Sequence, residues 1–317
     1  MNVAGLTPAL TRAVKASGQN QVLHSPGAMQ NPAAYYPIIR AFVNDPQASI
    51  PFFGLDRAFE RGLFTGLESA CQEYMGTEVK ARAEALLHSH FQSFFTENEY
   101  GRSVIEFAQH LVDEFLTNPD ANATLVFHLM GASGLAQVTR LLTPEHSKTR
   151  VIGLHLNRNT MDLSVTEKRI LHPRLVHYLW QEQALTSEQV VFVDVGYNGQ
   201  QARVLRNLLE NYSLIKYVQE ELDLRFTRNS WQTATRLYCL RSSRDSDPGA
   251  WGFNSARPEL SEETMLETAY VIDDTYLDRP SEVEKLEIQD DKVVIIGQAS
   301  DTRIRQIMEE EMLRAAA

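Results

Sequence analysis

The sequence predicts an α/β fold, built on an open, mostly parallel sheet with helices on both faces and preceded by a helical N-terminal region. Short, continuous apolar runs recur from the middle of the chain onward, which is typical of parallel strands buried on both faces. Segments of helical period separate the early runs, as the crossover connections of a parallel sheet require. The residues before the first run show a helical pattern instead.

The N-terminal part of the chain divides into an arm and a helical region. Residues 1–35 contain Gly, Pro, Asn and Gln without clear periodicity, which predicts a loose N-terminal arm. Residues 36–118 predict helices, because TEVKARAEALLHSHFQSFF (77–95) and SVIEFAQHLVDEFL (103–116) each place their apolar side chains near one face.

Residues 119–317 predict a Rossmann-like α/β domain that ends in an acidic C-terminal region. The predicted strands are the apolar runs at 124–130, 150–156, 189–195, 234–240 and 292–297. Right-handed crossovers would wind them into one sheet, with glycine-containing loops at the carboxyl ends of the strands. Open α/β sheets bind their ligands at those ends, so we expect the site there.

The net charge of −11 is unevenly distributed along the chain. Acidic residues exceed basic ones by nine from Arg257 to Ala317, whereas basic residues exceed acidic ones by five from Ala121 to Arg244. The overall charge argues against general nucleic-acid binding. The positive middle is compatible with an anionic small molecule, and the alternative is ordinary surface charge with an acidic tail.

The sequence also indicates a cytoplasmic protein. No apolar run has the roughly 18 to 20 residues that span a bilayer, and the N-terminus lacks the apolar core of a secretory signal. The cysteines are Cys71 and Cys239. We interpret them as two buried thiols in a reducing compartment, with one disulfide as the alternative.

The first candidate site is the loop MGASGLAQ, in which Gly131 and Gly134 flank Ser133 before a helix expected near Leu135. Glycines let a ligand approach the backbone, and the first amides of a helix can bind phosphate oxygens. Ser133 would donate a further hydrogen bond or cap the helix. The alternative is a tight turn that needs small residues for steric reasons.

The second candidate site is VVFVDVGYNGQQ, where Asp194 is expected to end a buried strand. A carboxylate there can hold a ribose hydroxyl pair, coordinate Mg²⁺ or orient a nucleophile; the alternative is that it caps the next helix. Neutral donors and glycines follow it and would contact the same ligand: Gly196, Asn198, Gly199, Gln200 and Gln201. Arg203 and Arg206 lie one turn further on, and at least one of them is expected to face the same pocket.

The third candidate is Arg158, after the second predicted strand, where a guanidinium could bind a phosphate. Asp162 could instead pair with it at the surface. Asp194 and Arg158 are thus the expected catalytic residues, and Mg²⁺ at Asp194 is the expected metal. The sequence has no HExxH motif and no paired CxxC, so we expect no zinc, and likewise no haem or iron–sulfur cluster.

Three segments resemble, in order, blocks from one bacterial family: LHLNRNTMDLS, VVFVDVGYNGQQ and ETMLETAYVIDDTYLDRP. The family consists of large proteins described as predicted HAD-superfamily hydrolases, often found with polysaccharide glycosyltransferases, and the likeness is to their C-terminal region. It covers roughly residues 120–290, and the matching positions are Arg158, Asp194, Gly196, Gly199, Gln201 and Glu267.

The chain departs from the family in two places: Tyr197 replaces a Trp, and Met130-Gly131-Ala132 stands where Arg-Asp-Gly is expected. No HAD domain is recognised here, so the family's phosphatase activity is not implied. The resemblance implies a Rossmann-like module for sugar or nucleotide chemistry.

From these observations we expect an enzyme that binds a phosphorylated sugar or nucleotide and transfers a glycosyl or phosphoribosyl group. Positioning and charge stabilisation supply most of the catalysis in such transfers, and the three loops offer both. Two alternatives stay open. One is an NADP-binding oxidoreductase similar to short-chain dehydrogenases, because GASGLAQ is followed by LNR after the next strand. The other is a non-catalytic α/β binding or assembly module.

Overall fold

The structure is a computed structural model that describes residues 8–18, 36–50, 57–118, 121–128, 132–154, 165–197, 200–221, 223, 235–241, 250–253, 282–298 and 303–317. Contacts divide the chain into two compact units. We call one the helical unit (Met1–Arg102, Asp274–Asp278 and Asp301–Ala317) and the other the α/β unit (Ser103–Asp273 and Arg279–Ser300). This division does not follow the ranges 1–35, 36–118 and 119–317, because the last helix of the chain packs with the N-terminal helices.

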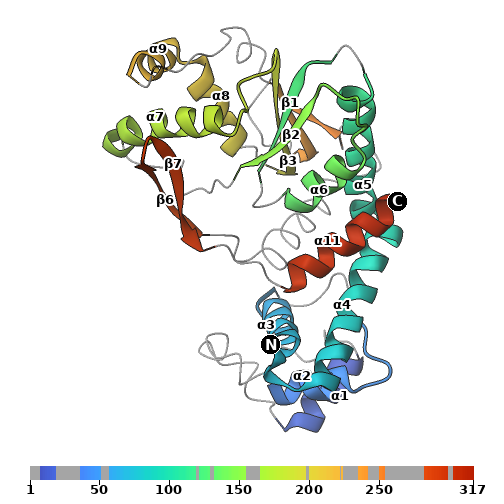
Figure 1. Ribbon diagram of the computed structural model, residues 1–317. Coiled ribbons are helices and arrows are strands. Elements are labelled where there is room, and N and C mark those ends of the chain that lie inside the picture. The colour runs from blue at the N-terminus through green and yellow to red at the C-terminus, as the bar shows by residue number, and fades with distance from the viewer. Residues whose placement is uncertain are drawn as a thin grey trace. The chain divides into compact units, whose positions relative to one another are not determined.

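The helical unit is built from helices that bury one face each (Figure 1). Its elements are α1 (Pro8–Ser17), α2 (Tyr36–Val43), α3 (Arg57–Ser69), the π-helical η5 (Ala70–Tyr74), α4 (Thr77–Glu97) and α11 (Arg303–Ala316). α5 (Glu99–Leu111) and the π-helical η6 (Val112–Leu116) follow α4 in the chain. The helical pattern predicted from residue 36 to residue 116 is therefore confirmed in its described part.

α1 corrects the expectation of a loose arm, because residues 8–17 form a helix. Pro8 occupies the first helical position, where its missing amide hydrogen is not needed. Leu10 and Val14 lie one turn apart and are buried, and α1 packs against α2. The short apolar stripe formed by Leu10 and Val14 is the sequence pattern that indicates this helix.

α4 is the longest helix of the unit and ends where the chain turns into α5. The Asn98 amide donates to the Ser93 carbonyl at 3.3 Å, which closes the last turn. Gly101 then passes so close to the Phe94 carbonyl that a Cβ at this position would overlap it. We conclude that the α4–α5 junction requires glycine at residue 101.

For Cys71, the structure distinguishes between a buried thiol and a disulfide. Cys71 is buried in η5 and forms no disulfide. Burial, with a smaller contribution from Glu84, raises the pKa of its thiol to about 12. Such a thiol stays protonated at neutral pH and is a poor nucleophile.

The α/β unit contains a five-stranded sheet in which neighbouring strands are parallel, in the order β2-β1-β3-β4-β5. Its strands are β1 (Ala123–His128), β2 (Arg150–Leu154), β3 (Gln189–Tyr197), β4 (Thr235–Arg241) and β5 (Ala250–Gly252). Four of the predicted apolar runs are thus confirmed as strands. β5 was not predicted, since three residues carry no readable pattern.

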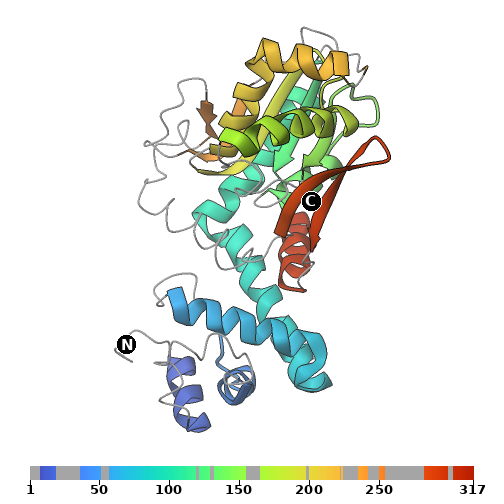
Figure 2. The same ribbon diagram turned by 90° about the vertical axis from the view of Figure 1, so that its left-hand side faces the viewer.

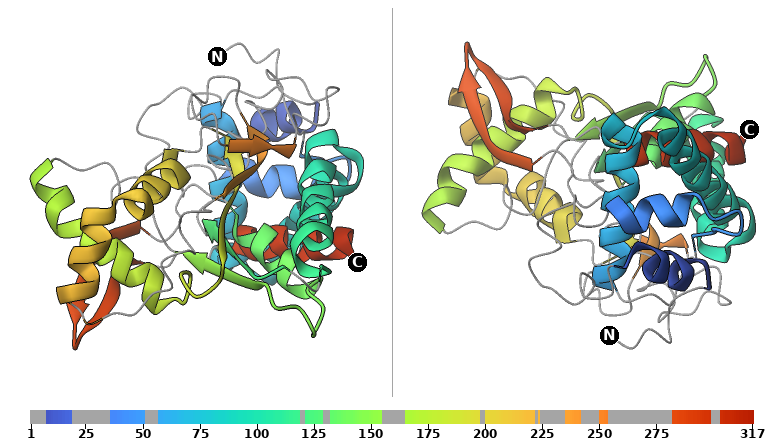
Figure 3. Two further views of the ribbon diagram at one scale, coloured as in Figure 1. Left: turned by 90° about the horizontal axis from the view of Figure 1, so that it is seen from above. Right: turned by 90° about the horizontal axis from the view of Figure 1, so that it is seen from below.

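Helices cover both faces of this sheet (Figures 1 and 3). They are α6 (Ser133–Leu141), α7 (Val165–Gln181), α8 (Gln200–Glu210) and α9 (Tyr212–Glu221). The chain moves outward from β1 to β2 through α6 and then back across the sheet to β3 through α7. Because parallel connections are right-handed, this reversal places α6 and α7 on opposite faces.

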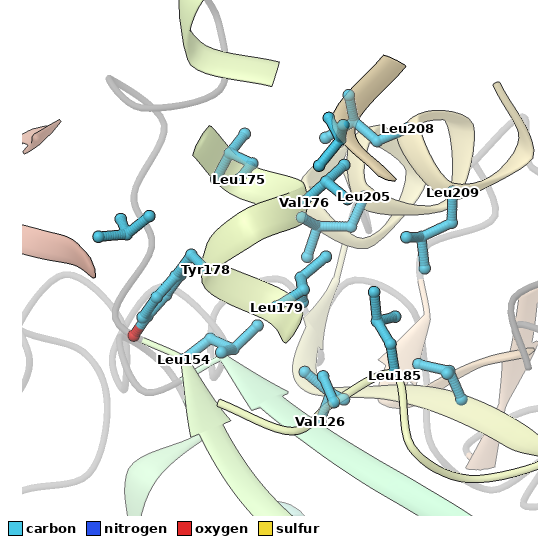
Figure 4. Close-up of a cluster of buried hydrophobic side chains, with 14 of the residues drawn as sticks. Val126, Leu154, Leu175, Val176, Tyr178, Leu179, Leu185, Leu205, Leu208 and Leu209 are labelled. Atoms are coloured by element: carbon cyan, nitrogen blue, oxygen red, sulfur yellow. The ribbon is translucent and has the colours of Figure 1, made fainter. Parts of the chain in front are cut away.

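The core on the α7 side joins strand and helix side chains in one apolar cluster (Figure 4). Val126 of β1 and Phe192 of β3 meet Leu179 of α7 and Leu205 of α8, all of them fully buried. Burying each such side chain stabilises the fold by about 1.5–3 kcal/mol.

The run at 292–297 is a strand, but its assignment to the parallel sheet was wrong. β7 (Lys292–Gln298) pairs antiparallel with β6 (Glu282–Gln289) in a separate two-stranded hairpin. Asp290 and Asp291 form the two-residue turn with φ of 49° and 61°. Two left-handed residues in succession suit the type I′ turn that closes tight hairpins, and aspartate tolerates that conformation.

Candidate functional site

The candidate site lies where β1 and β3 run side by side and their chains leave in opposite directions. After β1 the chain passes through α6 to β2, and after β3 it passes through α8 and α9 to β4. Such a reversal of strand order is a topological switch point. Open α/β sheets bind ligands beyond the carboxyl ends of the strands at this point.

The carboxyl end of β1 leads through a short turn into α6. The Ala132 amide donates to the His128 carbonyl at 2.8 Å, and the Ala136 amide donates to the Ala132 carbonyl at 2.9 Å. α6 therefore begins at Ser133, two residues earlier than expected. The amides of Gly134 and Leu135, in its first turn, have no acceptor within the helix.

Ser133 does not cap α6, which corrects one alternative for this residue. The N-cap position belongs to Ala132, which has no side-chain capping bond. Ser133 is instead the first helical residue, and it is buried. Its hydroxyl lies at the start of the helix, next to the backbone amides that were expected to hold a phosphate.

Asp194 lies inside β3 and does not end it, contrary to expectation. The strand continues to Tyr197, because β4 pairs with it as far as Arg241; Asp194 itself is paired with Tyr238. α8 begins only at Gln200, so Asp194 is too far away to cap it. The capping alternative is wrong, and the half-buried carboxylate needs another role.

Asp194 has a neighbour that the sequence analysis missed, His128. β1 and β3 pair in register up to Phe127 and Val193, so the next residues along the two strands are His128 and Asp194. Both lie two residues after a member of the apolar cluster, Val126 and Phe192 respectively, and so both face the α7 side of the sheet.

Backbones of neighbouring strands are about 4.8 Å apart, so His128 and Asp194 are neighbours on the same face of the sheet. His128 is 1% exposed. The signal that could have revealed it is a titratable side chain at the carboxyl end of an apolar run.

The other expected site residues are placed as follows. Gly196 lies in β3 opposite Leu240 of β4, and Gln200 and Gln201 are the first two residues of α8. Arg206 is directed to Glu210, one turn along α8, in an exposed ion pair. The expected residues outside the described part of the chain are Gly131, Arg158, Asn198, Gly199 and Glu267.

The metal chemistry of the site is that of a single carboxylate. Within the described residues, no three His, Cys, Asp or Glu side chains are grouped as a metal cage. Mg²⁺ is commonly held by one or two carboxylates together with the phosphates of a substrate. Asp194 fits that pattern.

Comparisons with known proteins do not add a relative to this picture. No family model matches the chain. No curated protein matches it either. In the described part of the chain, no helix combines the length and the apolar character needed to cross a membrane.

Proposed function

We propose that the sheet is a Rossmann-like nucleotide-binding sheet whose β1–β3 switch point binds a phosphorylated sugar or nucleotide. The observation that carries the proposal is the placement of His128, Asp194 and the first turn of α6 at the same carboxyl edge. A helix N-terminus favours an anion, whereas a carboxylate favours hydroxyl groups or a cation. A ligand that carries phosphate and hydroxyl groups on one sugar ring satisfies both.

The activity we propose is transfer of a glycosyl or phosphoribosyl group. The bond between the anomeric carbon and the leaving phosphate oxygen breaks, and a bond from the acceptor nucleophile to that carbon forms. The amides of Gly134 and Leu135, together with Arg158, stabilise the negative charge on the departing phosphate. Asp194 orients the sugar hydroxyls or accepts the proton of the acceptor.

Mg²⁺ bound by Asp194 and by the ligand phosphates would supply further charge stabilisation to the leaving group. The protein residues still have the task of orienting the sugar and excluding water. Asp194 is suited to this task because it is half-buried and anchored on a strand that is paired on both sides. Groups on rigid strands hold a reacting geometry better than groups on loops.

The strand order favours a mononucleotide-sized ligand over a dinucleotide. Two strands lie beyond β1 in the sheets that bind NAD or NADP, whereas β2 alone lies beyond β1 in the described sheet. In doubly wound sheets with the order observed here, a mononucleotide is bound at the β1/β3 switch point. The NADP-dependent oxidoreductase therefore becomes the second candidate.

The test is a thermal-shift and calorimetric screen with phosphoribosyl pyrophosphate, nucleoside diphosphate sugars and NADPH, each with and without Mg²⁺. Ligands that bind the native state raise its stability in proportion to the logarithm of their concentration. We expect stabilisation by a member of the first two classes and its loss in Asp194→Asn. The matched control is Asp113→Asn, an exposed carboxylate of η6 in the same unit. Stabilisation by NADPH alone would favour the oxidoreductase, and a folded protein that binds none of these ligands would favour a non-catalytic module.

A further inference from the structure

The β6–β7 hairpin is attached to α7 by a stripe of polar side chains. Arg174 and Gln181 lie seven residues apart, on the same face of α7. The Arg174 Nη1 atom donates to the Leu286 carbonyl of β6 at 2.7 Å. Gln181 binds β7 twice: its Nε2 atom donates to the Val293 carbonyl at 3.2 Å, and its Oε1 atom accepts from the Val293 amide at 2.8 Å. The stripe thus holds both strands of the hairpin.

Apolar contacts complete this attachment. Leu286 and Val293, which carry those backbone bonds, are 1% and 3% exposed and belong to the cluster of Figure 4. Figure 2 shows the hairpin running alongside α7. The hairpin has no strand partner other than its own two halves in the described part of the chain. An isolated hairpin is marginally stable in water, so its order depends on docking to α7.

His177 lies on the same stripe of α7, between Arg174 and Gln181, the two residues that bind the hairpin. Its side chain is 4% exposed, and its ring is 6.0 Å from that of Trp180. Within the described residues, its Nδ1 atom has no hydrogen-bond partner. Burial lowers the pKa of His177, and the carboxylate of Asp291 in the hairpin turn opposes this shift only in part.

The other charged groups near this helix do not offset a charge on His177. Arg174, one turn away, is itself a cation. On α8 and α9, which also pack against α7, Arg206 pairs with Glu210 and Lys216 pairs with Glu220. Asp290 and Lys292 beside Asp291 are exposed to solvent. A proton on His177 would therefore create a desolvated cation with one partial counter-charge.

We propose that the β6–β7 hairpin is a pH-sensitive flap that is released from α7 when His177 takes up a proton. In the docked state the imidazole is neutral and covered, so docking is at full strength above the ordinary pKa of histidine. As the pH falls below about 6.5, the released state binds the proton first and is favoured. The docking equilibrium then weakens by at most about tenfold for each pH unit until the docked state is protonated as well.

The proposal is tested by hydrogen–deuterium exchange of residues 282–298 in the full chain between pH 7.5 and 5, corrected for the intrinsic pH dependence of exchange. We expect protection of the hairpin to fall on acidification while β1, at residues 123–128, stays protected. His177→Gln should make hairpin protection independent of pH, whereas the matched control His146→Gln, at an exposed histidine of the same unit, should leave the pH dependence intact.

A second variant keeps the test decisive if His177→Gln packs poorly. Asp291→Asn removes the carboxylate that favours the protonated imidazole, so release should require a lower pH than in the parent chain. Gln181→Ala should expose the hairpin at every pH and gives the exchange rate of the released state. Hairpin protection that does not change with pH, or that is lost together with protection of β1, would overturn the proposal. So would an identical pH dependence in His177→Gln.

Discussion

Two elements from the end of the chain are attached to helices far away in the sequence. Both bury apolar side chains, and they differ in the polar groups that accompany this burial. In the helical unit, α11 packs against α4 and buries Ile304, Ile307 and Met308, and charged groups surround this apolar contact. The Nδ1 atom of His88 lies 2.6 Å from the Oε1 atom of Glu311, and the Nε atom of Arg303 lies 3.1 Å from the Oε1 atom of Glu84. In the α/β unit, the β6–β7 hairpin packs on α7 through buried apolar side chains and through Arg174 and Gln181, which bind uncharged backbone groups of the hairpin.

The two attachments are expected to respond differently to salt and to acid. Most of the charged groups between α11 and α4 keep contact with water, so their attraction is screened and each pair stabilises little. Glu311 is the exception, because it is 3% exposed and contacts both His88 and Arg314. The hairpin relies on removal of apolar surface from water, which salt does not screen. Acid acts on it through His177.

The largest expected effect is a cavity under the hairpin. Leu286→Ala should lower the free energy of unfolding of the α/β unit by about 2–5 kcal/mol, because a fully buried leucine is truncated. Ile288→Ala is the matched control on the same strand and the same face, with a side chain that is 45% exposed. It should change stability by no more than about 0.5 kcal/mol. Urea unfolding followed by segment-resolved hydrogen exchange measures both, and equal effects would contradict the apolar attachment.

The next effect separates two histidines of α4. His88 contacts Glu311 of α11, whereas His90 is 4% exposed and its Nδ1 atom lies 3.2 Å from the Ile50 carbonyl. Burial lowers the pKa of His90 to about 4. Its stabilising effect is complete above the ordinary histidine pKa of about 6.5 and is lost as the pH falls to 4, which amounts to about 3 kcal/mol.

His90→Leu should therefore flatten the acid-induced loss of stability of the helical unit between pH 6.5 and 4. The measurement is the urea midpoint of the helical unit at each pH. Asp45, whose pKa is lowered by its hydrogen bond with Arg12, loses that pair at lower pH in both proteins and cancels in the comparison. Parallel curves for the two proteins would show that His90 is not buried in its neutral form.

A smaller effect tests whether burial or charge decides the α11 attachment. Glu311→Gln should cost about 2 kcal/mol, because charge-assisted hydrogen bonds to a buried carboxylate are lost. Glu310→Gln is the matched control on the same helix: Glu310 is 43% exposed and pairs with Arg303 at 3.3 Å. It should cost less than about 1 kcal/mol. Exchange of residues 303–316 reports both, and a larger effect at Glu310 would reverse the interpretation.

The same contrast explains which parts of the fold the sequence predicts. β1 to β4 were recognised because each is a continuous apolar run, and that pattern follows from burial on both faces. A continuous apolar run does not specify which other strand it pairs with. β7 has the same apolar character, but its partner was set by the left-handed turn at Asp290 and Asp291, a signal that lies outside the run.

The sequence pattern did not predict the packing of α11 on α4 for a related reason. The sequence separation between His88 and Glu311 exceeds two hundred residues, and neither side chain departs from an ordinary amphipathic helix pattern. The residues of the candidate site also fall into two groups, those that local patterns predict and those that only the strand register reveals. The edge of the sheet that holds Ser133 and Asp194 follows from the order of strands and loops, which local patterns reveal. His128 was missed because only the register of β1 against β3 places it beside Asp194.

Salt should give the smallest effect and the sharpest separation of the two attachments. Raising the ionic strength from about 0.01 M to about 1 M shortens the screening length from about 30 Å to about 3 Å. The exposed contacts between α11 and α4, Arg303 with Glu84 and Glu310 with His88, then weaken, and we expect the protection of residues 303–316 to fall by an amount equivalent to less than about 1 kcal/mol. The protection of residues 282–298 should stay constant, because Arg174 and Gln181 bind uncharged backbone groups and apolar side chains form the rest of the contact. If both segments lost protection equally, charge would have to contribute to both attachments, and Arg174 would be the residue of α7 through which it acts on the hairpin.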